Sequence, residues 1–195
     1  MVFLSIQEVI DIIAMSLVVG LIFKDFFQSP TKTPEYYLKN VTPGRSIVSR
    51  LSMSNFWWAV ALVAPSIILH EFGHKFVALA FGLKATFNAA YGWLFAALVL
   101  KYLLGFVFFV PAYVAIRGAS TPLQDALTSF AGPAVNLALW LGAAFWLKNM
   151  RGFRSKKQQD LAMFLKAFSK INMFLFIFNM IPLPGFDGFH VLAAL

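Results

Sequence analysis

The pattern of apolar and polar positions divides the chain into four long apolar segments separated by polar ones. It predicts helices over Ile6–Phe23, Phe56–Gly82, Leu127–Leu147 and Leu161–Ile181. A helix needs about 20 predominantly apolar residues to cross a bilayer. The last three segments are long enough for this. The first is apolar only from Ile12 onward, which favours either a short span or a helix lying in the membrane interface.

Two short segments after the second helix predict a small β element. Ala85–Tyr91 and Ala112–Ile116 each have the length and composition of a strand, and each is followed by a glycine or an Arg-Gly pair. The apolar stretch between them, Trp93–Val110, either crosses the membrane or re-enters it.

The remaining segments are polar, and two of them are basic. Lys24–Ser54 and Lys148–Lys157 read as loops outside the membrane. Glu8 and Asp11 stand near the start of the first helix, where a carboxylate complements the helix dipole. A solvated helix end is therefore the expected setting for both, with metal ligation as the less favoured alternative.

The composition narrows the class of protein. Of the 195 residues, 60% are hydrophobic and only 12% are charged, which indicates a multi-pass integral membrane protein, and we expect it in the plasma membrane. The simplest organisation is one domain over 1–195, with a core over 56–190 and an N-terminal helix and loop over 1–55. The net charge of +8 suits a lipid bilayer with anionic headgroups, and no pattern typical of nucleic-acid binding is present.

The second helix carries the strongest chemical signal, the motif H-E-x-x-H at residues 70–74. His70 and His74 lie one turn apart on one face of a helix, so both can ligate a single zinc ion. Glu71, on the flank of that face, can act as general base on a zinc-bound water. Because the chain has no cysteine, any further protein ligand must be His, Asp or Glu.

A catalytic zinc site commonly has three protein ligands, and Asp187 is the best candidate for the third. It follows a helix that Pro182 and Pro184 interrupt, and backbone freed in this way is tolerated inside a membrane only where it packs against protein or lines a cavity. Gly188 permits close approach of the backbone. The alternative, which the spacing leaves open, is that Asp187 caps a helix at the membrane surface.

Taken together, these motifs resemble the site-2 proteases, which are intramembrane zinc metalloproteases. The family has three signatures: H-E-x-x-H, then G-P-x-x-N, then N-x-x-P-x-P-x-x-D-G. Here they fall in the same order at 70–74, 132–136 and 179–188. The last includes Asn179, Pro182, Pro184 and Gly188. Phe186 stands where the family usually has Leu, and Trp93–Val110 is longer than the corresponding stretch of the family.

The resemblance implies an α-helical polytopic bundle of about four transmembrane helices with a small membrane-associated β-loop. It implies one Zn²⁺ per chain held by His70, His74 and Asp187, with Glu71 as the catalytic base. The implied activity is endopeptidase cleavage of transmembrane segments of membrane protein substrates. Tyr113 and Val114 of the β-loop would contact the substrate. Asn136 would hold the substrate backbone, or would instead satisfy a neighbouring helix.

Two other functions fit some of the same residues. A membrane metal transporter or ion relay also places His, Glu and Asp in its spans, although it would spread them along a path. A catalytically dead adaptor of the same fold is the other alternative, and the intact Glu71 argues against it.

The chain's topology follows from sharing one metal. His74 and Asp187 are both expected toward the C-terminal ends of their helices, so those helices must run parallel. This requires Trp93–Val110 to re-enter rather than cross. The basic loops then lie on one side, which the positive-inside rule places in the cytoplasm. The family resemblance implies the opposite orientation, so the orientation stays open.

Overall fold

The computed structural model describes residues 3–27, 53–105, 110–150 and 155–194. In chain order the elements are α1 (Ile6–Phe23), α4 (Met53–Ala80), β1 (Lys84–Ala89), α5 (Tyr91–Leu104), β2 (Ala112–Arg117), α6 (Pro122–Asn149), α7 (Lys156–Asn179) and α8 (Asp187–Ala193). The prediction of a mostly helical protein with a small two-stranded sheet is confirmed. By length and composition, four of the described helices can cross a membrane: α1, α4, α6 and α7. Residues 28–52 and 151–154 of the predicted basic loops, and residues 106–109 of Trp93–Val110, lie outside the described residues.

Three of these long helices begin with a capping box, in which a Ser or Thr side chain and a Glu or Gln three residues later satisfy free backbone N–H groups. The pairs are Ser5 with Glu8, Thr121 with Gln124, and Ser155 with Gln158. The cap at Ser155 makes α7 begin at Lys156, earlier than the predicted Leu161, because the polar first turn is stabilised by its cap rather than by burial.

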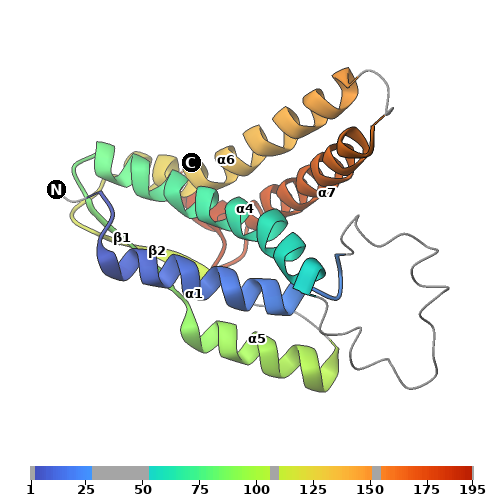
Figure 1. Cartoon of the computed structure of the whole chain (residues 1–195). Helices are drawn as coiled ribbons and strands as arrows, with labels where there is room; N and C mark the ends of the chain where they lie inside the picture. Colours follow the sequence, from blue (N-terminus) through green and yellow to red (C-terminus); the bar gives the residue numbers. More distant parts are fainter. Residues whose placement is uncertain (1–2, 28–52, 106–109, 151–154, 195) are drawn as a thin grey trace.

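Helix α4 lies at the centre of the bundle. It packs against α6 and α7 on one side and against α1 and the sheet on the other (Figure 1). α5 lies along α1, and α8 packs against α6. The buried hydrophobic core joins α1, α4, the sheet and α5, with Met15, Leu62, Phe87 and Leu94 among its members. The H-E-x-x-H motif therefore stands on a helix that has other elements packed on both sides.

The sheet brings together the two ends of the segment between its strands. β1 and β2 pair antiparallel, and Ala89, where β1 ends, is the partner of Ala112, where β2 begins. The Ala90 N–H also donates to the Pro111 carbonyl, at 3.1 Å. The chain therefore leaves along α5, a helix of 14 residues, and returns to its starting point. This agrees with re-entry of Trp93–Val110.

The first helix closes one edge of the sheet, and this corrects the expectation of a solvated helix start. Glu8 and Asp11 are only 3% and 4% exposed. Glu8 pairs with the buried Lys75 and accepts the Phe87 backbone N–H at 2.7 Å, while Asp11 accepts the Ala89 N–H at 3.3 Å. Burial next to a strand edge makes these carboxylates hydrogen-bond acceptors for the sheet, which a reading of the helix alone misses.

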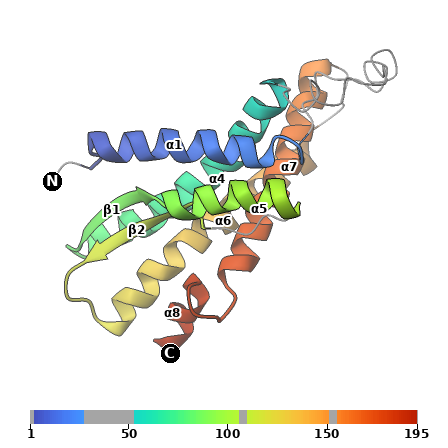
Figure 2. The same cartoon turned by 90° about the horizontal axis from the view of Figure 1, so that it is seen from below.

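Among the described residues, no strand pairs with the opposite edge, along β2. In an antiparallel pair, N–H groups that point away from the partner belong to non-hydrogen-bonded pairs. The Phe87 N–H points toward α1, so its register partner Val114 directs its own backbone groups away from β1. Figure 2 shows α1, β1 and β2 in that order, with β2 farthest from α1.

Candidate metal centre

Helix α4 presents His70 and His74 toward α6, and a glycine in each helix makes this approach possible. A Cβ at Gly73 would lie 2.7 Å from the Ala131 carbonyl oxygen, so the two backbones are in direct contact there. A Cβ at Gly132 would lie 2.6 Å from Cε1 of His74 and 2.8 Å from Cε1 of His70. The missing side chain at Gly73 thus lets the two helices meet, and the one missing at Gly132 leaves the space that the two buried imidazoles occupy.

Asp187 reaches the same place from the other end of the chain. α7 ends at Asn179, and a turn containing Pro182 and Pro184 leads to α8. A Cβ at Gly188 would lie 2.8 Å from Cα of Met180, so the turn folds back closely on the end of α7. Asp187 is the first residue of α8 rather than the C-terminal end of a helix, which corrects the expectation from sequence: two prolines stop α7, and a new helix begins.

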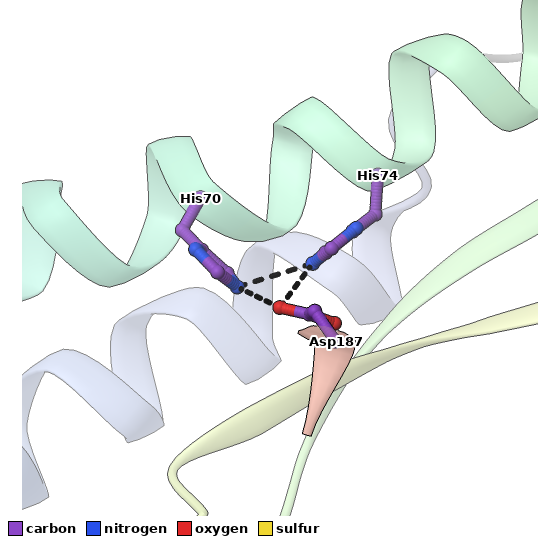
Figure 3. A group of neighbouring side chains, drawn as sticks. All are labelled: His70, His74 and Asp187. Atoms are coloured by element: carbon purple, nitrogen blue, oxygen red, sulfur yellow. Dashed lines mark hydrogen bonds and ion pairs between the residues drawn. The ribbon is translucent and has the colours of Figure 1, made fainter. Parts of the chain in front are cut away.

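The three candidate ligand atoms converge on one point (Figure 3). Nε2 of His70 lies 3.1 Å from Nε2 of His74 and 3.2 Å from Oδ2 of Asp187, and Nε2 of His74 lies 3.5 Å from the same oxygen. Zinc bonds of about 2.0–2.1 Å at a tetrahedral angle separate neighbouring ligand atoms by about 3.3 Å. The spacing and the mixture of imidazole and carboxylate therefore fit a zinc ion.

Hydrogen bonds on the far side of each ring favour metal binding. Nδ1 of His74 lies 2.8 Å from the Thr128 carbonyl oxygen, and Nδ1 of His70 lies 2.6 Å from Oδ1 of Asn136. A carbonyl oxygen only accepts, so Nδ1 must carry the hydrogen of a neutral ring. This leaves the Nε2 lone pairs directed at the metal position, which is the usual arrangement behind a metal-bound histidine.

The surroundings of Asp187 favour its carboxylate form. Burial alone would raise the pKa of its carboxyl, but the contacts with His70 and His74 outweigh burial and lower the pKa to about 2. A divalent ion would bind this carboxylate together with both imidazoles in their neutral form.

Glu71 lies next to this group without belonging to it. The candidate metal group found among the described residues consists of His70, His74 and Asp187. The Glu71 side chain is buried, and the Val114 backbone amide of β2 lies within hydrogen-bonding reach of its carboxylate. The general-base candidate is thus placed between the metal position and the open edge of the sheet.

The other predicted site residues occupy different surroundings. Asn136 has no exposed surface and stands behind His70, so its contact with substrate stays a prediction. Tyr113 is half exposed on β2. Asn179 closes α7, with its amide donating to the Leu175 carbonyl at 3.0 Å.

The sequence analysis did not identify Thr128 or the spatial role of Gly132. Thr128, Gly132 and Asn136 are spaced four residues apart, so they share one face of α6, and all three contact the histidines. That spacing could have been read from the sequence. The contact of Thr128 could not, because it is made by a backbone carbonyl.

Comparison with known proteins gives two relatives. The chain is 36% identical to "Putative zinc metalloprotease MJ0611" of Methanocaldococcus jannaschii over 132 residues, or 67% of this chain and 66% of the relative. It is 29% identical to "Putative zinc metalloprotease YwhC" of Bacillus subtilis over 147 residues, or 69% of this chain and 67% of the relative. The chain thus spans about two thirds of the length of these relatives.

No protein-family model and no solved structure matches the chain significantly. The donor geometry and the two relatives agree on zinc as the metal of the His70, His74 and Asp187 group. Both relatives are named as zinc metalloproteases, and the metal in those names fits the donor set found here.

Proposed function

We propose that the protein is an intramembrane endopeptidase that cleaves transmembrane segments of membrane protein substrates, as its resemblance to the site-2 proteases implies. The observation that carries the proposal is the position of the metal group. Its two histidines stand on the central helix of a bundle whose long helices can cross a membrane. Ionisable groups at such depth are costly and usually mark a functional site.

The chemistry follows from the zinc group and Glu71. Zinc held by the three ligands supplies Lewis acidity, which makes a water molecule more acidic and polarises the peptide carbonyl to be cleaved. Glu71 takes the proton of the attacking water as the new carbon–oxygen bond forms. It then delivers that proton to the amine nitrogen as the carbon–nitrogen bond breaks. Burial of Glu71 keeps bulk water away from this transfer.

The open edge of β2 is the proposed place for the substrate. A transmembrane helix must unwind before its peptide bonds can be attacked, and an unwound segment can pair with a free sheet edge by strand addition. The outward carbonyl of Val114, whose N–H lies near the Glu71 carboxylate, would hold such a segment next to Glu71. Tyr113, half exposed, would contact its side chains.

The decisive experiment compares Glu71→Gln with the wild type in detergent or in proteoliposomes that contain a helical membrane substrate. Glutamine preserves size but cannot accept a proton, and loss of a general base costs about 10²–10⁴-fold in rate. We expect cleavage to fall by this factor while zinc content and helicity are retained. Asp160→Asn, near the start of α7, is the matched control and should cleave normally.

The outcome also separates the alternatives. A transporter would show metal flux and no cleavage by the wild type, and a dead adaptor would show neither. Undiminished cleavage by Glu71→Gln would refute the proposed mechanism.

A further inference from the structure

A chain of buried polar side chains lies behind His70 and joins three helices. Ser66 of α4, Asn136 of α6 and Asn172 of α7 each have no exposed surface. Polar groups at such positions are costly unless every hydrogen and lone pair is used, so the direction of each hydrogen bond can be worked out.

The amide of Asn172 is oriented by groups other than Asn136. Its Nδ2 donates to the Phe168 carbonyl at 2.8 Å and to Oγ of Ser66 at 2.9 Å. The Ser66 hydroxyl in turn donates to the Leu62 carbonyl, at 3.0 Å. Both amide hydrogens of Asn172 are used, so its Oδ1 is left to accept.

The amide of Asn136 then has one possible orientation. Its Nδ2 donates to Oδ1 of Asn172 at 2.9 Å and to the Ser66 carbonyl at 3.1 Å. A flipped amide would place its oxygen against these two acceptors and its hydrogens toward His70. The oxygen of Asn136 therefore faces His70, at 2.6 Å from Nδ1.

We propose that Asn136, oriented by Asn172 and Ser66, is a positioning residue that holds His70 in the tautomer whose Nε2 lone pair binds zinc. An acceptor at Nδ1 favours the ring hydrogen on that atom, which leaves the lone pair of Nε2 for a metal ion bound between His70 and Asp187. Through Asn172, α7 thus contributes to metal affinity although it supplies no ligand. This inference concerns the metal group and holds whether or not the substrate is a membrane segment.

The two histidines differ in this respect. Nδ1 of His74 uses the Thr128 carbonyl, a backbone group that no substitution removes. Nδ1 of His70 depends on a side chain whose orientation comes from a second and a third side chain. Substitution of Asn136 or Asn172 should therefore change the tautomer of His70 and leave the tautomer of His74 unchanged.

The test measures zinc affinity by competition with a fluorescent chelator and the imidazole tautomer by ¹⁵N NMR of the zinc-free protein, at a pH high enough for the imidazoles to be neutral. The chain has three histidines, so few signals need assignment, and His190 serves as an exposed reference. Loss of a hydrogen-bond partner behind a metal-bound histidine typically weakens metal binding about 10–100-fold. We expect Asn136→Leu to weaken zinc binding by this factor and to give His70 a mixture of tautomers.

The second variant, Asn172→Leu, leaves Asn136, the hydrogen-bond partner of His70, in place. Asn172→Leu leaves Asn136 with one unpaired amide hydrogen and frees it to flip, so it should change the same two measurements in the same direction by less. Asn149→Leu, an exposed position of α6, is the matched control and should change neither. Wild-type zinc affinity and a single His70 tautomer in folded Asn136→Leu or Asn172→Leu would overturn the proposal. Neither measurement needs a substrate, so failure of the proposed protease function would leave this result untouched.

Discussion

Gly132 of α6, which lies against both imidazoles, gives the sharpest test of the metal geometry. In Gly132→Ala the added methyl group would collide with Nε2 of His74, the ligand atom itself, and would lie 2.6 Å from Cε1 of the same ring. Ordinary contacts begin at 3.4 Å, so the ring must recede by at least about 0.8 Å. A metal site tolerates deviations of only about 0.2 Å in its bond lengths. Rotation of the His74 ring cannot relieve this contact without breaking the hydrogen bond of Nδ1 to the Thr128 carbonyl, at 2.8 Å.

We therefore expect Gly132→Ala to weaken zinc binding by about 100-fold or more, which corresponds to about 2.8 kcal/mol at about 1.4 kcal/mol per tenfold. Helix propensity acts in the opposite direction, since Ala is favoured over Gly in a helix interior by about 1 kcal/mol. Zinc content after gel filtration, chelator competition and circular dichroism measure the two effects separately.

Gly142→Ala is the matched control. It makes the same substitution in the same helix, but a Cβ there would meet no heavy atom within 4 Å. It should gain the helix propensity and keep wild-type zinc affinity. If Gly132→Ala binds zinc as tightly as Gly142→Ala, the two imidazoles do not occupy the space that Gly132 leaves, and the geometric reasoning is wrong.

Further predictions concern the third ligand, the topology and the closed sheet edge. Asp187→Ala should lose most of its zinc, and full zinc occupancy by atomic absorption would show that the third ligand is misassigned. Single cysteines introduced at the exposed positions Thr86 and Ser120 in this cysteine-free chain should react with an impermeant reagent from the same side of the membrane, and labelling from opposite sides would contradict re-entry. Lys75→Met should destabilise the fold by about 3–5 kcal/mol in thermal unfolding, because it leaves the buried Glu8 carboxylate unpaired. Adding Glu8→Leu should recover part of that loss, and no recovery would count against a buried ion pair.

Local information accounts for what could be read from the sequence alone. Apolar runs are properties of consecutive positions, so they predicted α1, α4, α6 and α7, although the polar first turns of α6 and α7 begin five residues before the predicted starts. The spacing of His70 and His74 specifies a shared helix face. The two prolines predicted a break before Asp187, since proline has no N–H to continue a helix.

Only the tertiary structure decided which backbone and side-chain groups meet across elements. It paired Glu8 with Lys75, placed the Thr128 carbonyl behind His74, and turned the amide of Asn136 toward His70. The hydrogen bonds of Asn172 alone join positions 36 and 106 residues apart, to Asn136 and to Ser66. No periodicity in the sequence connects positions so distant. The open edge of β2 also depends on α1 occupying the other edge. Local patterns determine which groups a segment offers, whereas burial against other segments determines which of them must be paired.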